Sequence, residues 1–131
     1  MVTYRHSCIV VNDLKKAVKL YSKNFEMKVI NEDYLLPSHS ANLTGKSGMS
    51  LKYVKLEDCK GNIIELIEAN HKINGHLSFT VTDMKSMYRK LKNKLTFYSE
   101  PFKAPDSGFK VCWAEDEDGN IIELVEPTTK K

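Results

Sequence analysis

GNIIELIE at residues 61–68 and GNIIELVE at residues 119–126 are two nearly identical phrases in one chain, and they decide the fold. Each follows a turn-forming segment that ends in glycine, and each predicts a β-strand with a glutamate at its centre, Glu65 or Glu123. A repeat at this scale is typical of a duplicated fold. The two copies are expected to pack together, because each alone would have too small a core.

The segments around the two phrases repeat in the same order, which is strand, helix and three strands. An aspartate at the start of each helix, Asp13 or Asp83, suits an N-cap. In the first module the predicted segments are strands over 4–11, 27–33, 49–57 and 62–69, a helix from Leu14 and a loop over 34–48. In the second module they are strands over 75–82, 109–115 and 120–126, a helix from Met84 and a loop-rich stretch over 96–108. The fold class is therefore α+β, in one domain over 1–131 with a first module at 3–69 and a second at 75–127.

A histidine opens the first strand of each module, His6 in one and His76 in the other. In each strand the histidine is predicted to face away from the main apolar residues. In the first strand, Tyr4, His6, Cys8 and Val10 are expected on one face and Ile9 and Val11 on the other. In the strand over 75–82, His76, Ser78 and Thr80 are expected on one face and Leu77, Phe79 and Val81 on the other. A strand with such a polar face suits the wall of a cleft.

The order His6, Glu65, His76, Glu123 is thus a His–Glu pair repeated once. Any one of these residues has an ordinary interpretation, a solvated glutamate on an exposed edge strand or a structural histidine. Repetition at matching module positions favours a shared site. Two imidazoles and two carboxylates suit a divalent metal that activates an oxygen-bearing substrate, so the four are predicted metal ligands.

Other polar residues are weaker candidates. Glu68 and Glu126 also repeat, but they lie three residues beyond Glu65 and Glu123, on the opposite strand face, where solvation or pairing with lysines is expected. His39 and His71 have no counterpart in the other module and are predicted surface residues.

Four further features have structural interpretations. Cys8 is expected to be a small buried residue, although it could face the same cleft as the histidines. The acidic segment 116–119 fits a turn better than a calcium loop. Trp113 and Phe109 could shape a substrate pocket, but core packing is the expected role.

Bulk properties exclude several classes of protein. The chain has 131 residues, 41% hydrophobic and 28% charged, with a net charge of +3 from dispersed lysines, so neither disorder nor nucleic-acid binding is expected. No apolar run approaches a membrane span and no signal peptide is expected. Three widely spaced cysteines argue against a disulfide framework and predict a cytoplasmic protein.

The chain resembles the vicinal oxygen chelate superfamily, which includes glyoxalase I, bleomycin-resistance proteins, methylmalonyl-CoA epimerases and extradiol dioxygenases. The resemblance covers residues 4–127 and is carried by the opening segment from His6 to Tyr21, by Gly75-His76, and by the segment from Glu115 to Leu124. It implies paired βαβββ modules whose mixed sheet curls around a metal cleft. A His-Glu-His-Glu set is most similar to short bacterial glyoxalase I (lactoylglutathione lyase).

That resemblance implies a lyase or isomerase. Glu123 or Glu65 would take a proton next to a metal-chelated carbonyl–hydroxyl pair, giving an enediolate, with a glutathione hemithioacetal as one candidate substrate. It implies nickel or cobalt, with zinc as a further option. It also implies a homodimer in which His6 and Glu65 of one subunit meet His76 and Glu123 of the other, and a small molecule as the only other partner.

The chain departs from glyoxalase I at two positions. Glyoxalase I typically has an arginine four residues after its first ligand and an asparagine four after its second, both contacting glutathione, whereas this chain has Val10 and Ala69. Two alternatives therefore stay open. One is an epimerase of the methylmalonyl-CoA type on the same site, and the other is a non-catalytic dimer that binds a drug or metabolite.

Overall fold

The structure is a computed structural model that describes residues 1–35, 48–70 and 72–128. Its first module contains β1 (Val2–Val10), α1 (Leu14–Asn24), β2 (Lys28–Leu35), β3 (Leu51–Glu57) and β4 (Ile63–Ala69). Its second contains β5 (His76–Val81), α3 (Met84–Leu91), β6 (Thr96–Phe97), β7 (Phe102–Lys103), β8 (Lys110–Glu115) and β9 (Ile121–Glu126). The α+β class and the paired βαβββ modules are confirmed, and the bounds of the single domain stay a prediction.

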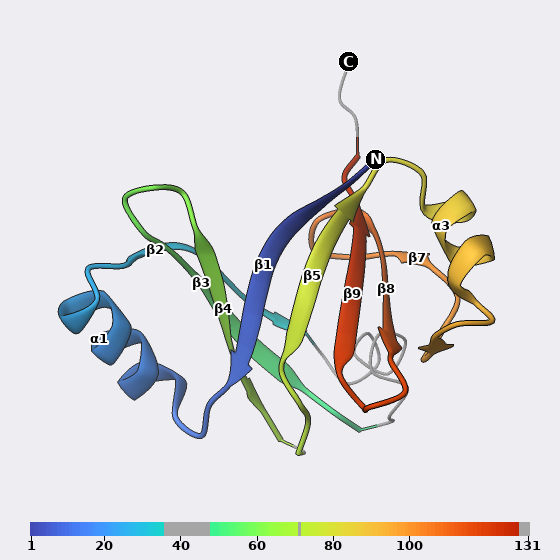
Figure 1. The fold of residues 1–131 in the computed structure, drawn as a ribbon. Helices are drawn as coiled ribbons and strands as arrows, with labels where there is room; N and C mark the ends of the chain where they lie inside the picture. Colours follow the sequence, from blue (N-terminus) through green and yellow to red (C-terminus); the bar gives the residue numbers. More distant parts are fainter. Residues whose placement is uncertain (36–47, 71, 129–131) are drawn as a thin grey trace.

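The nine strands within the described residues form one mixed sheet in the order β2-β3-β4-β1-β5-β9-β8-β6, with β7 also paired to β8. Within each module the first strand runs parallel to the last, β1 beside β4 and β5 beside β9. The modules join through the antiparallel pair β1–β5 at the centre of the sheet (Figure 1). The first strands of the two modules are therefore neighbours, although they are far apart in sequence.

The helices lie on the outer side of the curled sheet, α1 beside the first module and α3 beside the second (Figure 1). Leu14, Ala17, Val18 and Tyr21 of α1 pack with Val54, Leu56 and Leu66, and Met84 of α3 packs with Val81, Cys112 and Leu124. A third apolar cluster, on the inner side, contains Leu51, Tyr53, Ile67, Val111, Trp113 and Val125. The inner cluster supplies the walls of the site.

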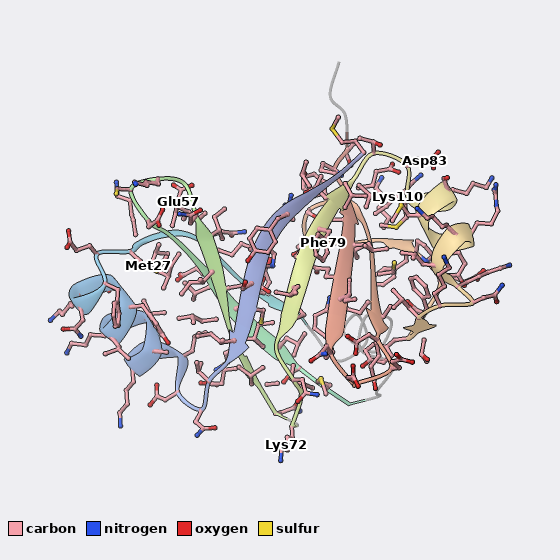
Figure 2. All side chains as sticks on the ribbon, viewed as in Figure 1. Met27, Glu57, Lys72, Phe79, Asp83 and Lys110 are labelled. Atoms are coloured by element: carbon pink, nitrogen blue, oxygen red, sulfur yellow. The ribbon has the colours of Figure 1, made fainter. Side chains whose placement is uncertain are left out.

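Both helices start where the sequence predicts. Asp13 accepts a hydrogen bond from Lys16 N at 3.1 Å, and Asp83, labelled at the start of α3 in Figure 2, accepts one from Ser86 N at 3.0 Å. These N-caps satisfy amide groups that the first helical turn leaves without a partner.

The second repeated glutamate of each phrase supports the same helix starts. Glu68 Oε1 accepts a hydrogen bond from Leu14 N at 2.9 Å, and Glu126 Oε1 accepts one from Met84 N at 2.7 Å. Each also lies near a lysine, Lys52 Nζ at 3.7 Å from Glu68 and Lys110 Nζ at 3.8 Å from Glu126. The predicted lysine pairing is confirmed. The helix contact was not predicted, because it depends on a strand end meeting a distant helix.

Several details of the sequence prediction need correction. The stretch over 96–108 contains two short strands, β6 and β7, which pair with β8. Strand β2 continues to Leu35, two residues into the predicted loop, while residues 36–47 of that loop and both His39 and His71 lie outside the described residues. Among the described helices, none is long and apolar enough to span a membrane.

Candidate metal centre

Strand pairing alone brings the four predicted ligands to one place. Opposite residues of paired strands point to the same face of a sheet. Glu65 lies opposite Cys8 on β1, and Glu123 lies opposite Ser78 on β5. His6 in turn lies opposite Ser78 across the central β1–β5 pair. The carboxylates and imidazoles therefore occupy adjacent positions on the inner face.

This arrangement rules out the ordinary interpretation of the two glutamates. Strand β4 lies between β3 and β1, and β9 lies between β5 and β8, so neither is an edge strand. The carboxylate side chain of Glu65 is 9% exposed and that of Glu123 is 14% exposed. His6 and His76 are also buried. Buried carboxylates and imidazoles require charged or hydrogen-bonded partners, and here they provide them for one another.

The four side chains meet at a single point. His6 Nε2 lies 3.3 Å from His76 Nε2. Glu65 Oε1 lies 3.2 Å from His76 Nε2 and 3.5 Å from His6 Nε2. Glu123 Oε1 is slightly farther, at 3.6 Å from His76 Nε2 and 3.7 Å from His6 Nε2.

These separations fit a metal centre. Ligands bonded to a tetrahedral zinc ion at about 2.0–2.1 Å lie roughly 3.4 Å apart. Among the described residues, the potential ligand atoms of His6, Glu65 and His76 all lie within 4.8 Å of one another. Glu123 Oε1 adds a fourth ligand atom at the edge of this group. The nitrogen and oxygen donors are those that zinc, nickel and cobalt accept.

The charges at this point also favour a cation. Burial alone would raise the pKa of the Glu65 carboxyl, but hydrogen bonds from His6 and His76 outweigh it and hold the pKa below its usual range. Burial alone would lower the pKa of His76, but its neighbours Cys8, Glu65 and Glu123 hold it well above the ordinary value. Without metal the centre therefore keeps a proton on His76, and a metal cation would replace that proton.

One chain supplies all four side chains, which differs from the expectation of a site divided between two subunits. The difference follows from the topology. Because β1 and β5 are hydrogen-bonded neighbours within the chain, His6 and His76 meet without a second copy. A complete set of ligands thus needs only one subunit.

Cys8 and Ser78 occupy equivalent places beside the histidines. Cys8 is buried, and burial raises the pKa of its thiol. Cys8 belongs to the inner apolar cluster and is not among the clustered ligand atoms of His6, Glu65 and His76, which fits the prediction of a small buried residue better than a ligand role.

The two glutamates of the metal centre line a cavity of about 370 Å³ on the inner face of the sheet. Glu65 and Glu123 line it, together with aromatic and aliphatic side chains. Its lining also includes Arg5, Asn31, Tyr53, Lys55, Phe102, Asp106, Phe109 and Trp113. The volume suits a small-molecule ligand.

Trp113 and Phe109 combine the two roles considered for them. Trp113 is buried in the inner apolar cluster and Phe109 packs against that cluster, but both also line the cavity. Trp113 Nε1 donates a hydrogen bond to Glu123 Oε2 at 3.1 Å, and its ring lies 4.9 Å from that of His76. Trp113 therefore holds one oxygen of Glu123 while the other faces the histidines.

Sequence reasoning missed Arg5, which lines the cavity next to His6. The β1–β5 register shifts between Tyr4 and His6, so β1 contains a bulge that adds one residue. Tyr4 consequently packs against Phe79, on the helix side, rather than sharing a face with His6 as predicted. Alternation by two cannot reveal such an inserted residue, and nothing else in this sequence marks it.

Comparison with known proteins identifies the family of the chain. Residues 3–124 match the glyoxalase/bleomycin resistance protein/dioxygenase superfamily. A hypothetical protein of Bacillus halodurans C-125 has a similar structure, with a TM-score of 0.73 at 18% identity over 99% of this chain and 97% of that one. Methylmalonyl-CoA epimerase of Mycobacterium tuberculosis has a TM-score of 0.74 at 19% identity, over 96% of this chain and 88% of that one.

A mutant 4-hydroxymandelate synthase of Streptomyces coelicolor gives a TM-score of 0.70 at 13% identity, over 99% of this chain and 50% of that one. These likenesses concern the fold, and a search of curated proteins found no match. The family match spans nearly the whole repeat and both histidine–glutamate pairs. The chain therefore belongs to the glyoxalase/bleomycin resistance protein/dioxygenase superfamily.

Proposed function

We propose that the protein is a metal-dependent lyase or isomerase of the glyoxalase I type. It would remove a proton from a carbon next to a chelated carbonyl–hydroxyl pair. The observation that carries this proposal is the convergence of His6, Glu65, His76 and Glu123, two of which, Glu65 and Glu123, line a ligand-sized cavity. A glutathione hemithioacetal is one candidate substrate.

His6, Glu65 and His76 would hold the ion, because their ligand atoms lie closest together. A divalent cation there would supply Lewis-acid polarisation of the substrate oxygens. Nickel or cobalt is the proposed metal and zinc the alternative, since all three accept imidazole and carboxylate ligands.

Glu123 is the better candidate for the base. Its Oε1 is farther from both histidines than that of Glu65, and its carboxylate is more exposed to the cavity. Its Oε2 is held by Trp113, so Oε1 is the atom available to accept a proton. Glu123 Oε1 would take the proton as the C–H bond breaks and the substrate becomes an enediolate, then return it to the adjacent carbon. Glu65, in contact with both histidines, is the second choice.

An epimerase of the methylmalonyl-CoA type remains the second candidate. Val10 and Ala69 stand where glyoxalase I has its glutathione-contacting arginine and asparagine, and neither is among the cavity-lining residues that the structure describes. An epimerase needs a group that accepts the proton from the carbon α to a carbonyl, and it needs no glutathione contacts. The same pair of glutamates would serve it.

We also propose a homodimer in the cytoplasm. Val2, Tyr4, Ile9 and Leu77 are apolar or aromatic side chains exposed on the two central strands, β1 and β5. A second copy covering them would remove apolar surface from water. The cytoplasmic location rests on the cysteine pattern of the sequence.

Proton exchange in deuterated water tests this function. Metal-loaded protein would be incubated with methylglyoxal plus glutathione, or with an acyl-CoA epimer, and followed by NMR. Net conversion of the first supports a glyoxalase, and α-deuteration of the second with formation of the other epimer supports an epimerase. Glu123→Gln should lower either rate at least about 100-fold while metal stays bound. A protein that binds these compounds without conversion or exchange would instead be a binding module.

A further inference from the structure

Two cationic side chains, Arg5 and Lys55, line the same cavity as Glu65 and Glu123 of the metal centre. Both are half-buried. Among the side chains that the structure describes, neither forms an ion pair with a carboxylate, although Glu65, Glu123 and Asp106 line the same cavity. Half-buried positive charges without a counter-ion suit the recognition of an anion.

The bulge in β1 places Arg5 in the cavity. Because it adds one residue between Tyr4 and His6, both Arg5 and His6 can face the inner side. Arg5 Nη1 donates a hydrogen bond to Thr80 Oγ1 at 3.3 Å, and its guanidinium lies 5.8 Å from the centre of the Phe109 ring. These contacts orient the guanidinium without neutralising it.

Strand register places Lys55 on the same face. Lys55 of β3 lies opposite Glu65 on one side and opposite Asn31 on the other. Its Nζ lies 5.8 Å from the centre of the Tyr53 ring rather than in an ion pair with Glu65. Glu65 is bound instead by the two histidines. The ammonium group is thus available to a ligand beside the metal centre.

Neither charge is required by the repeat. His6 and His76 are 70 residues apart, and the same offset makes Gly75 the counterpart of Arg5. Glu65 and Glu123 are 58 residues apart, and this offset makes Trp113 the counterpart of Lys55. The second module thus replaces both cations with a glycine and an indole. The cavity therefore has cations contributed by the first module and an apolar wall from the second, which includes Phe102, Phe109 and Trp113.

The charge balance of the cavity selects a monoanion. A divalent cation at the metal centre would balance Glu65 and Glu123. Arg5 and Lys55 would then face one remaining lining carboxylate, Asp106, which accepts a hydrogen bond from Tyr53 Oη at 2.8 Å. The excess of one positive charge matches a carboxylate better than a phosphate, which carries about −1.5 to −2 at neutral pH.

We propose that the substrate carries a carboxylate, bound by Arg5 and Lys55, on a short carbon chain that leads to the oxygens placed at the metal centre. The apolar wall would contact the chain between the two ends. This inference rests on the proposed function, because it assumes that the metal centre is the second anchor.

Matched hydroxamates test it, because a hydroxamate chelates metal through adjacent oxygens. The probes are the monohydroxamates of succinic and adipic acid, each compared with the neutral butyro- or hexanohydroxamate of equal length. Calorimetry on zinc-loaded protein would measure the affinities. The wild type should bind at least one carboxylate-bearing probe about tenfold more tightly than its neutral partner.

Arg5→Gln and Lys55→Met should each remove most of that preference and leave the affinity for the neutral probe unchanged, which also shows that the fold is intact. Lys52→Met is the matched control, because Lys52 lies on the same strand but pairs with Glu68 outside the cavity. It should preserve both affinities.

The outcomes separate the two proposals. If the neutral probes bind but the wild type shows no preference for carboxylate, or if neither cavity variant reduces it, the carboxylate inference is wrong and the metal centre stands. If the protein takes up no zinc, or if no probe of either kind binds the zinc-loaded protein, the metal-centre proposal fails and the carboxylate inference fails with it.

Discussion

The Nε2 atoms of His6 and His76 lie 3.3 Å apart across the centre of the sheet. This contact is a direct consequence of the repeat. Equivalent residues of two modules come together only where the modules meet, and here they meet at the first strand of each. Two glutamates from the last strands complete the group, because each last strand runs beside the first strand of its own module.

The metal-free protein should lose stability in mildly alkaline solution. The pKa of His76 is raised above its ordinary value of 6.5 by its neighbours. The proton on His76 therefore stabilises the folded state, fully below pH 6.5, and this stabilisation is lost as pH rises through the folded-state pKa. For one proton the loss in unfolding free energy is at most about 1.4 kcal/mol per pH unit. Thermal unfolding in EDTA between pH 5 and 9 would measure this.

Glu65 contributes stability with the opposite dependence on pH, because its pKa is lowered from the ordinary value of 4.5. Its stabilisation is present above pH 4.5 and is lost as pH falls toward the folded-state value. The midpoint temperature should therefore be highest between about pH 4.5 and 6.5. His76→Gln should flatten the alkaline decline, and an equally steep decline in that variant would show that another group causes it.

Trp113→Phe should slow catalysis without releasing the metal. The change removes the donor to Glu123 Oε2 but keeps an aromatic ring beside His76. Hydrogen bonds to charged groups contribute roughly 1.5–3 kcal/mol, so a loss of about tenfold or more in the proton-exchange rate is expected.

Tyr98→Phe is the control for Trp113→Phe. Tyr98 donates to Glu115 at 2.6 Å, a carboxylate that is not part of the metal centre. It should leave the exchange rate unchanged. Equal effects of the two substitutions would mean that Trp113 acts only through general stability.

Glu126→Ala should destabilise the fold by about 0.5–2 kcal/mol, because Met84 N loses its acceptor at the start of α3. Lys110→Ala removes only the exposed ion pair with Glu126 and should cost less than about 1 kcal/mol. Urea unfolding of both variants measures the difference. Equal costs would mean that the helix contact contributes nothing.

Gly75→Ala should be among the most damaging small substitutions. A Cβ at Gly75 would lie 2.2 Å from the carbonyl oxygen of Cys8, which is main chain and cannot rotate away. Overpacking of this kind costs about 1–3 kcal/mol, and here it would also displace the adjacent His76. Metal affinity should fall together with stability.

Gly119→Ala provides the comparison, because Gly119 has a positive φ of 85° but the nearest atom to its Cβ is a flexible Glu115 oxygen at 3.7 Å. It should reduce stability through backbone strain and leave metal affinity unchanged. A loss of metal in Gly119→Ala and not in Gly75→Ala would contradict this account.

Most of the fold follows from the sequence, because the duplicated phrases and the two helix patterns each have a clear period. The convergence of Glu65 and Glu123 with the histidines followed from repetition alone. The residues that escaped prediction depend on tertiary structure. Arg5 reaches the cavity through a bulge, Lys55 through strand register, and Glu126 through contact with a distant helix.

The metal content of freshly purified protein tests the central claim most directly. Mass spectrometry should find about one nickel, cobalt or zinc ion per chain in the wild type. His76→Ala and Glu65→Gln should lose most of it, because His76 and Glu65 form the closest ligand pair, at 3.2 Å. A wild type that binds none of these ions, even after each is added, would contradict the account of a metal centre and leave a cavity that binds its ligand without one.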